Sequence, residues 1–436
     1  MAEPDQTYDP LTPVPTGDRV FAGGDAFSLW FSLGVGLLVL QAGAFLVPQL
    51  SLGAALAAIA AGSGLGVVLL AAAGVVGADT GLSAMGALRP ALGVRGAGVP
   101  AVLNAVQLTG WGAFEIIAMR DAANALAQRA FGVSNPLAWT LAFGVLATAL
   151  AVIGPVSFVR RFLRAWGLWL HLAGAAWLSW RLLARYDLVA LLAKPGTGGL
   201  SFGAGVDLVV AMPLSWLPLI ADYTRFGRSP GAMFRGSAAG YFVANIWFMG
   251  LGACYAAATH GAEGLLLTSL AASGGGFALL LIVIDETDNT FADIHSAAVS
   301  TATLIRARPS RLSLVFGVVC TGIAALAPIA RYQGFLLLIG SVFAPLFGVL
   351  LADHFVVRRR RLDIAGLKAS GGAYWFTGGL HLSGLAAWLA GIGAYQAVSH
   401  WVPDLGATLP AFAVAAVVYL GLRLTRGRPS GAFEAA

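Results

Sequence analysis

Long apolar stretches alternate with short polar connections along the whole chain. A helix needs about 20 apolar residues to cross the hydrocarbon core of a bilayer, and the sequence provides twelve such stretches. The expected spans are 27–50, 52–77, 98–126, 136–154, 162–184, 203–222, 236–259, 273–304, 311–328, 334–357, 373–398 and 405–424. The pattern therefore predicts an all-α membrane protein with twelve transmembrane helices.

Composition supports this class and excludes others. Apolar residues make up 58% of the chain and charged residues 11%, whereas about a quarter of the residues of a soluble protein are charged. The net charge of +6 does not indicate a nucleic-acid partner, because the basic residues form short runs between spans instead of one basic face. Cys254 and Cys320 lie in separate apolar segments, so neither a disulfide nor a zinc site is expected.

Basic residues also set the expected orientation. With the N-terminus in the cytoplasm, the inside connections hold most of the 26 Lys and Arg residues, and a cytoplasmic excess of these residues is the usual determinant of topology. Arg120 falls within a span, and the outside connections hold only Arg129, Arg181, Arg185, Lys194 and Arg331. We therefore expect a multi-pass protein of the cell inner membrane with both termini in the cytoplasm and no removed signal peptide.

Two spans contain residues that interrupt helices. The first span carries Gly34, Gly36 and the polar Gln41, and the sixth carries Pro213 and Pro218 in its middle. Unwound backbone inside a membrane needs a cavity or a ligand to satisfy its polar groups, and interruptions at matching positions of two halves indicate a transporter's binding site. Glycine and proline are also common in ordinary membrane helices, so these two interrupted spans do not by themselves establish a binding site.

The third span carries a polar stripe. Asn104, Gln107, Trp111 and Glu115 lie within about 80° of one another on a helix. A planar heterocycle could stack on Trp111 while Gln107 and Glu115 form hydrogen bonds with its edge. The alternative is that Glu115 pairs with a basic or polar neighbour and Trp111 only packs.

The segment IDETDNTFADIHS, residues 284–296, is the most acidic part of an apolar region. A charged side chain at mid-membrane costs roughly 2.5 to 3.5 kcal/mol, so its carboxylates need partners, protons or cations. A solvated loop is the alternative, but apolar residues on both sides favour a membrane helix. One face of that helix would hold Asp285, Glu286, Asn289, Asp293 and Ser296, and another face would hold Asp288 and His295.

Three short motifs lie on the third, sixth and eighth spans. They are Gln107 and Trp111 spaced as Gln-x-x-x-Trp, ADYTRFGRSP at residues 221–230, and TDN at residues 287–289. Together they resemble the nucleobase:cation symporters, which include cytosine permease. The stretches QAGAFLVPQL, LNAVQLTGW and DETDNTFADIHSAAVS look most like the hydroxymethylpyrimidine permease branch, CytX, associated with uptake of a thiamine precursor. The resemblance covers residues 25–400.

The resemblance implies the leucine-transporter fold, a 5+5 inverted repeat with a central site. The repeats would be residues 26–185 and 203–357, followed by helices eleven and twelve in residues 373–425. Residues 1–25 would be a disordered cytoplasmic tail, and residues 426–436 a second cytoplasmic tail. Breaks in the first and sixth helices would face the third and eighth helices.

The resemblance also implies roles for individual residues. Trp111 would stack on a flat nitrogen heterocycle and Glu115 would bind its edge. Relatives carry a small hydroxyl residue and an aromatic in the sixth-helix break, where this chain has Met212 and Pro213, so Ser215 and Trp216 would take over those tasks. The expected substrate-binding set is Gln41, Asn104, Gln107, Trp111, Glu115, Met212, Pro213, Ser215, Trp216, Glu286, Asp288 and Asn289.

A coupling cation is the last implication. A sodium site in this fold takes carbonyls from the first-helix break and hydroxyls from helix eight, which here predicts a possible sodium near Leu38, Gln41 and Thr287. Residues 280–284 offer no hydroxyl, so protons carried by carboxylates are the alternative. The expected ion-coupling residues are Asp285, Thr287, Thr290 and Asp293.

These observations favour a secondary active transporter that imports a pyrimidine-type heterocycle by cation-coupled alternating access. Hydroxymethylpyrimidine is the leading substrate, because the N–H groups of an aminopyrimidine suit the Glu115 carboxylate. A cytosine or other nucleobase permease is one alternative, and a metal-ion or amino-acid carrier of the same fold is another. The expected partners are a small heterocycle and the lipid bilayer, with no nucleic acid, no obligate protein partner and no cofactor besides the coupling sodium or proton.

An intramembrane enzyme is not expected. Asp285 and Asp293 lie on one helix, about 12 Å apart along its axis, whereas an aspartyl protease needs two carboxyl groups within hydrogen-bonding distance. The sequence also contains no GxSxG or HExxH motif.

Overall fold

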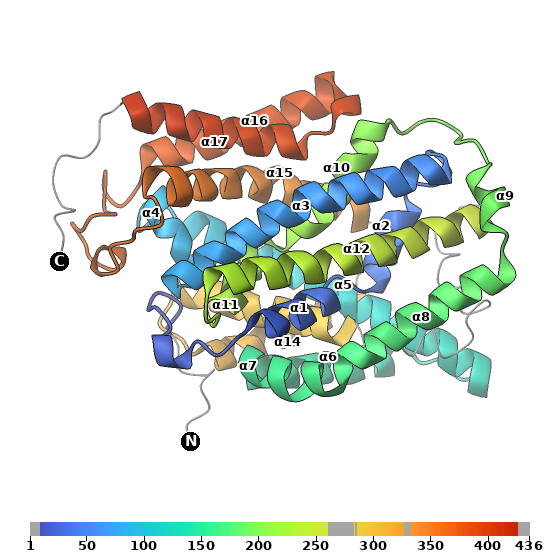
Figure 1. Ribbon diagram of the computed structural model, residues 1–436. Coiled ribbons are helices and arrows are strands. Elements are labelled where there is room, and N and C mark those ends of the chain that lie inside the picture. The colour runs from blue at the N-terminus through green and yellow to red at the C-terminus, as the bar shows by residue number, and fades with distance from the viewer. Residues whose placement is uncertain (1–8, 260–282, 284–285, 327–331, 426–436) are drawn as a thin grey trace.

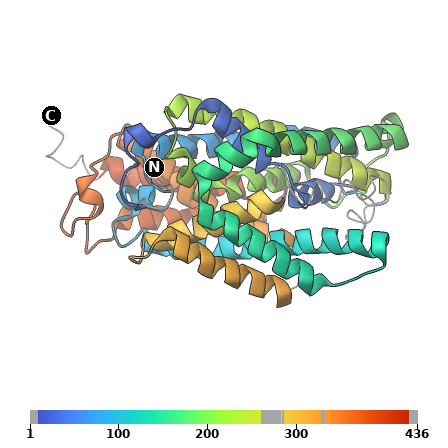
Figure 2. The same ribbon diagram turned by 90° about the horizontal axis from the view of Figure 1, so that it is seen from below.

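The computed structural model describes residues 9–259, 283, 286–326 and 332–425. Within these residues the chain is helical and forms no β-strand. The long helices run side by side along one axis, and the start of α1 and the end of α17 lie at the same end of the bundle (Figures 1 and 2). We call this end of the bundle the α1 end.

The described helices follow the expected order along the chain. The segment 286–302 is also helical, and we call it helix 286–302. The others are α1 (Gly23–Ser32), α2 (Leu37–Ala44), α3 (Leu52–Thr80), α4 (Arg89–Leu92), α5 (Gly98–Phe131), α6 (Pro136–Ile153), α7 (Pro155–Ser157), α8 (Leu168–Arg185), α9 (Leu188–Leu192), α10 (Phe202–Ser215), α11 (Leu217–Thr224), α12 (Pro230–Thr259), α14 (Pro309–Leu326), α15 (Tyr332–Leu351), α16 (Leu382–Trp401) and α17 (Thr408–Thr425), with π-helical segments η4 (Phe158–Gly167) and η5 (Ala352–Val357).

The all-helical membrane fold is confirmed. Seven helices of the described residues are long and apolar enough to cross a membrane, and a bent pair of helices brings the number to eight. Helices α8, α16, α17 and 286–302 fall in the remaining expected spans, so the count of twelve stays a prediction. Part of the expected eighth span, residues 273–282, lies outside the described residues.

Two regions differ from the sequence prediction. Helix eleven begins at Leu382 instead of residue 373, because Phe376, Gly378 and Gly379 have positive φ angles that stop a right-handed helix. Residues 9–25 do not form the expected disordered tail. The side chain of Val14 is 1% exposed, and its N–H donates to the carbonyl of Gly81 at 2.9 Å.

The first span is broken in its middle, as the sequence predicts. Helices α1 and α2 meet at an angle of 62°. Gly36 ends the break with φ = 152°, a conformation that favours glycine because it lacks a Cβ atom. The break leaves the start of α2 with no capping side chain of its own, so the first N–H groups of α2 need other acceptors.

The interruption of the sixth span is smaller than expected. Only Trp216 separates α10 from α11, and among the described residues the first span is the one pair that bends by more than 40°. The Trp216 N–H donates to the Pro213 carbonyl at 3.3 Å, three residues back in the chain. The Ser215 hydroxyl donates to the Met212 carbonyl at 2.7 Å.

Small residues let the helices around the site approach one another closely. On α3, a Cβ atom at Gly66 would lie 2.3 Å from the Pro213 ring of α10, and a Cβ at Gly62 would lie 2.6 Å from Val209. Close backbone approach through small residues is a common packing mode of membrane helices. It holds α10 against α3 next to the sixth-span interruption.

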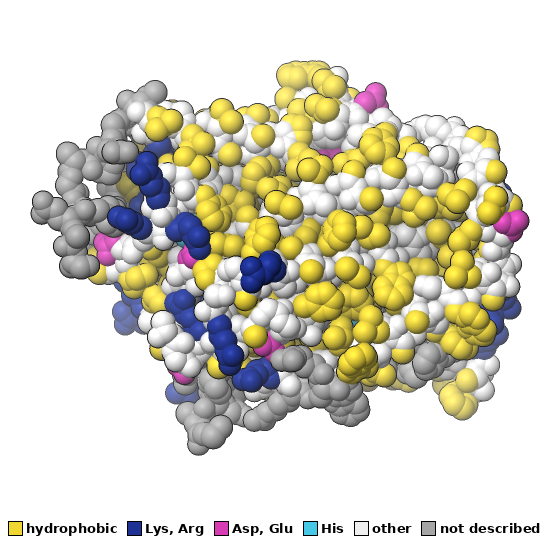
Figure 3. Space-filling view, viewed as in Figure 1, with side chains coloured by type: hydrophobic (Ala, Val, Ile, Leu, Met, Phe, Trp, Pro, Cys, Tyr) yellow, Lys and Arg dark blue, Asp and Glu magenta, His cyan; other side chains and the backbone are white. Residues whose placement is uncertain are grey.

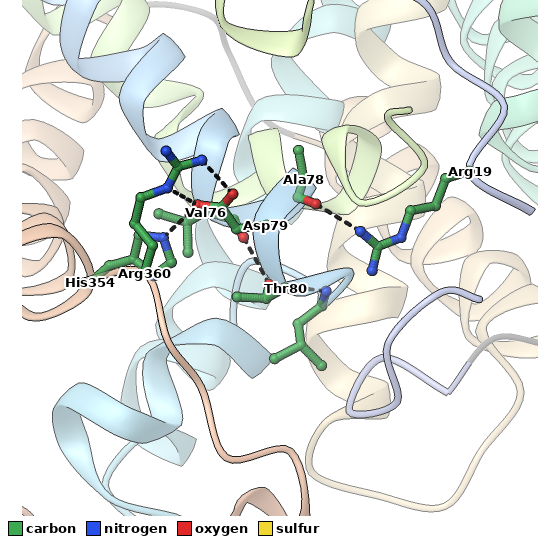
Figure 4. A network of polar contacts seen from close by, with 8 residues as sticks. Arg19, Val76, Ala78, Asp79, Thr80, His354 and Arg360 are labelled. Atoms are coloured by element: carbon green, nitrogen blue, oxygen red, sulfur yellow. Dashed lines mark hydrogen bonds and ion pairs between the residues drawn. The ribbon is translucent and has the colours of Figure 1, made fainter. Parts of the chain in front are cut away.

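A network of polar contacts closes the α1 end of the bundle (Figure 4). Asp79 on α3 bonds with His354 of η5 at 2.9 Å and with Arg360 at 2.6 and 2.8 Å. The bond to Asp79 raises the pKa of the Arg360 guanidinium. Arg19 donates to the carbonyls of Ala78 and Val14, which ties the segment before α1 to α3. Lys and Arg side chains gather at this end, and the rest of the visible face is largely apolar (Figure 3).

The packing of α3 against α10 gives a testable prediction. Gly66→Ala places a methyl group against a rigid proline ring, and overpacking of this kind costs about 1 to 3 kcal/mol. We expect the thermal unfolding midpoint of the purified protein in detergent to fall. The matched control is Gly64→Ala on the same helix, where the nearest atom, Phe242 Cε2, lies at 3.9 Å. Equal midpoints for the two variants would contradict the packing described here.

Candidate functional site

Three side chains of helix 286–302 hold the break of the first span. They are Glu286, Asp288 and Asn289, which we call the clasp. Glu286 accepts from the N–H of Leu37, and Asp288 accepts from the hydroxyl of Ser32. Asn289 donates to the carbonyl of Val35. The clasp therefore contacts the end of α1, the unwound residues and the start of α2.

Glu286 completes the open end of α2. Its carboxylate accepts a hydrogen bond from the Leu37 N–H, one of the first N–H groups that have no partner within the helix. The N-terminus of a helix also carries a partial positive charge, which favours a nearby carboxylate. Glu286 is fully buried, so no water competes for this contact.

Asp288 belongs to a chain of hydrogen bonds across three helices. The Ser32 hydroxyl donates to the Asp288 carboxylate and lies 2.9 Å from Nδ1 of His171 on α8. Ser32, Asp288 and His171 are 0%, 2% and 4% exposed. The contact connects the end of α1 to helix 286–302 and to the fifth span.

A small cavity lies beside the clasp, between the first-span break, α5 and the junction of α10 and α11. The volume open to the centre of a water molecule is about 20 Å³, which is room for about one water. A six-membered ring is larger than one water molecule, so its binding requires lining side chains to move. The lining residues are Leu33, Gly36, Leu38, Val39, Trp111, Glu115, Met212, Ser215, Trp216, Leu219, Asn289 and Asp293.

Two indole rings belong to the cavity wall. The Trp111 ring lies 5.3 Å from the Phe335 ring of α15, at an interplanar angle of 70°. Trp216 meets Trp30 of α1 edge to face at 6.1 Å. Such edge contacts hold aromatic rings in defined orientations, and a flat ligand can stack on rings held in this way.

The cavity wall also contains two buried hydrogen-bond acceptors. Oε2 of Glu115 and Oδ1 of Asn289 have no hydrogen-bond partner among the described residues. A buried acceptor without a donor costs free energy, and most buried polar atoms in proteins are satisfied. The two atoms therefore give the cavity the means to receive N–H groups of a ligand.

Half of the expected substrate-binding residues line this cavity. They are Trp111, Glu115, Met212, Ser215, Trp216 and Asn289, and they come from α5, the junction of α10 and α11, and helix 286–302. Asp293 and Leu38, expected near the coupling ion, are also in the lining. The other six expected substrate residues are not: Gln41, Asn104, Gln107, Pro213, Glu286 and Asp288.

Two of these six hold the helices of the site together. The side-chain amide of Asn104 donates to the Pro218 carbonyl of α11 at 3.1 Å and to the Ser300 hydroxyl at 2.8 Å. Gln107 donates to the side-chain carbonyl of Asn104 at 2.7 Å. These contacts tie α5 to α11 and to helix 286–302.

The hydroxyl groups expected at the coupling ion donate to carbonyls of their own helix. Thr287 donates to the Val283 carbonyl at 2.9 Å and lies 3.4 Å from Met119 Sδ on α5. Thr290 donates to the Glu286 carbonyl of its own helix at 2.7 Å. Asp285 lies outside the described residues. The side chains of helix 286–302 that reach the break are the two carboxylates and the amide of the clasp.

Sequence reasoning missed several contributors to the site. Ser32 and His171 lie 139 residues apart in the chain, and Ser32 and Asp288 lie 256 apart, so no local spacing indicates that they meet. The sequence marks Gly36 as a helix breaker, but it does not indicate that Gly36 lies in the cavity wall. Leu33, Val39 and Leu219 are apolar residues in apolar spans and carry no signal of their own.

Comparison with known proteins identifies the family of this chain. Residues 13–421 match the family described as permeases for cytosine/purines, uracil, thiamine and allantoin. The cytosine permease of Escherichia coli K12 is 27% identical over 301 residues, which covers 66% of this chain and 67% of the relative. The hydantoin permease of Microbacterium maritypicum is 23% identical over 380 residues, 81% of this chain and 76% of the relative.

Solved structures share the fold. A nucleobase-cation-symport-1 family transporter in a closed conformation with bromovinylhydantoin bound aligns with a TM-score of 0.81 at 20% identity, covering 96% of each chain. A sodium-coupled sialic acid symporter aligns with a TM-score of 0.64 at 12% identity, covering 96% of this chain and 92% of the symporter. The chain therefore belongs to the nucleobase:cation symporter family and is a membrane transporter, not an enzyme.

Proposed function

We propose that this transporter imports an aminopyrimidine, with hydroxymethylpyrimidine as the leading substrate and cytosine as the alternative. The observation that carries the proposal is the pair of buried acceptors, Glu115 Oε2 and Asn289 Oδ1, in the wall of a cavity that also holds two indole rings. An aminopyrimidine brings two N–H donors on its exocyclic nitrogen and a flat ring, so it matches both features.

The charge of Glu115 favours amino over oxo substrates. A carboxylate accepts hydrogen bonds and does not donate them. It therefore attracts an amino edge and opposes the carbonyl oxygens of uracil or hydantoin. Similarity to a cytosine permease and to a hydantoin permease supports a nitrogen heterocycle without choosing between these edges.

In this proposal the lining side chains divide the task. Trp111 stacks on the ring, Glu115 and Asn289 accept its N–H groups, and Met212, Ser215 and Trp216 cover it from the sixth span. Asn104 and Gln107 position the helices. Import proceeds by alternating access in the inner membrane, with the α1 end in the cytoplasm, because an excess of Lys and Arg marks the cytoplasmic side.

A cation-coupled carrier needs oxygen ligands or titratable groups beside the substrate, and the clasp supplies them. Either a sodium ion or protons can serve as the driving ion with such groups. A metal-ion carrier of the same fold is the second functional candidate, since a manganese transporter of Eremococcus coleocola aligns with a TM-score of 0.58. It is weaker, because the described residues contain no group of three metal-binding side chains, and Trp111 would have no task.

Substrate selectivity tests the role of Glu115. Glu115→Gln replaces a charged hydrogen-bond acceptor by a neutral one. A hydrogen bond to a neutral acceptor is about half as strong as one to a charged acceptor. We expect cytosine and hydroxymethylpyrimidine to bind about 5- to 30-fold more weakly, a loss of roughly 1 to 2 kcal/mol, and uracil binding to stay the same or improve. Isothermal titration with the purified protein measures the three affinities.

The matched control for this experiment is Asp121→Asn, on the same helix but paired with Arg120 at 2.7 Å and outside the cavity wall. It should leave all three affinities as in the wild type. If Glu115→Gln keeps the preference for amino over oxo rings, the assigned role of Glu115 is wrong. Stabilisation by divalent metals with no response to any heterocycle would favour the metal-ion carrier.

Removal of the Trp111 ring tests the stacking role. Stacking of a base on an aromatic side chain is worth about 1 to 3 kcal/mol, so Trp111→Ala should weaken every ring substrate by about 5- to 150-fold. Trp169→Ala, which removes an indole that is 65% exposed on α8, is the control. A similar loss of affinity in both variants would mean that Trp111 has no specific contact with the substrate.

A further inference from the structure

Helix 286–302 carries three buried carboxyl groups that form no ion pair among the described residues. Glu286, Asp288 and Asp293 are 0%, 2% and 3% exposed. None of the ion pairs among the described residues includes any of them. Buried carboxylates without counter-charges are strongly unfavourable inside a membrane protein. Part of this negative charge must therefore be neutralised by bound cations or by protons.

The described residues favour protons at the first-span break. A sodium ion prefers several hard oxygen ligands around one point, but among the described residues the hydrogen bonds of the Thr287 and Thr290 hydroxyls are with Val283, Met119 and Glu286, and none is with the first-span break. The Val35 carbonyl at the break accepts from Asn289. The Asp288 carboxylate stands where helix 286–302 meets the end of α1.

The Ser32 hydroxyl allows two arrangements of the hydrogen-bond chain. In the first, His171 is an imidazolium, protonated on both ring nitrogens; its Nδ1–H donates to Ser32, and Ser32 donates to the ionised Asp288. In the second, protonated Asp288 donates to Ser32, and Ser32 donates to the bare Nδ1. A hydroxyl serves in both because it is a donor and an acceptor.

The two arrangements are connected by a balanced proton shift. The Nδ1–H bond breaks and its proton forms a new O–H bond on Ser32, while the former hydroxyl proton of Ser32 moves to Asp288. An imidazolium and a carboxylate thereby become a neutral imidazole and a carboxylic acid. The chain can hold one proton at either end without a change in its total charge.

We propose that Ser32, His171 and Asp288 form the proton-carrying site of this transporter, so that a proton and not a sodium ion drives import. This inference rests on the proposed transport function. It gives Asp288 a role other than the substrate contact expected from the sequence. While the chain holds its proton, Ser32 keeps the end of α1 bonded to Asp288 of helix 286–302. When α1 moves away, Ser32 separates from Asp288 and His171, and the exposed Asp288 releases the proton.

Position couples this site to the substrate. Asp288 is followed directly by Asn289, which both lines the cavity and bonds with the first-span break. A ligand bound to Asn289 and a proton bound to Asp288 therefore both change the stability of the same contact, the one between helix 286–302 and the first-span break. Binding of each favours the arrangement that the other needs, which is reciprocal coupling.

Other ionisable groups face this region and must be separated from Asp288 in any pH experiment. Among the described residues, α1 carries Asp25 near its start, where it accepts from the Ala22 N–H. The remaining groups are His171 on α8, Glu115 on α5, Asp222 and Tyr223 on α11, Arg225 directly after α11, Tyr241 on α12, and Glu286, Asp293 and His295 on helix 286–302.

An infrared titration of the purified full-length protein tests the site without any substrate. We expect a carboxylic-acid band that disappears as the pH rises, that loses one component in Asp288→Asn, and that is unchanged in Asp121→Asn. Asparagine is close in shape to aspartate and can still bond with Ser32, so the fold should persist. Ser32→Ala should shift the frequency of the Asp288 component. A titrating band that is the same in Asp288→Asn and the wild type overturns the proposal.

Transport in proteoliposomes tests the coupling, with cytosine and hydroxymethylpyrimidine as probes. An inward proton gradient without sodium should drive accumulation, and Asp288→Asn should exchange probe across the membrane but accumulate it at least tenfold less. Accumulation driven by sodium alone, with no response to the proton gradient, overturns the proposal. If the wild type neither binds nor exchanges the probes, the proposed substrate fails, and the infrared titration still decides the proton site.

Discussion

The structure of this transporter depends on one contact, the bond from the Leu37 N–H to the buried Glu286 carboxylate. A membrane helix can break in its middle only if other groups satisfy the exposed backbone. Gly36 makes the break sterically possible but has no side chain to cap the new helix. Glu286 provides the acceptor and the negative charge that the start of α2 requires. Without it, the first span would have to be continuous or admit water.

The same contact positions the cavity. Because Glu286, Asp288 and Asn289 are neighbours on one helix, fixing the first fixes the other two at the break. Asn289 then presents an acceptor to the cavity opposite Glu115 of α5, and the small residues of α3 hold the sixth span close enough to close the remaining side. The cavity has room for about one water molecule, so entry of a ring requires the elements around the break to move.

Much of this organisation can be predicted from the sequence, because hydrophobicity, charge and glycine content follow directly from the residue types. Apolar spans and basic connections predict a helical membrane protein, glycines mark the first-span break, and carboxylates in an apolar segment mark a site. The polar stripe of α5 predicts only half of its roles. Trp111 and Glu115 reach the cavity, whereas Asn104 bonds with α11 and helix 286–302 and Gln107 bonds with Asn104. Paired prolines predict a second large break, but only Trp216 separates α10 from α11, and the two helices bend by less than 40°. The contacts of Ser32 and His171 depend on tertiary packing, which no local pattern encodes.

An experimental density map of the substrate-bound protein, detailed enough to place side chains, tests the central claim most directly. It should show the first span interrupted at Gly36, the Glu286 carboxylate on the Leu37 N–H, and the ring of the substrate between Trp111 and the break, with its N–H groups on Glu115 and Asn289. A first span that runs unbroken through residue 36, or a ring bound away from these residues, would contradict the account.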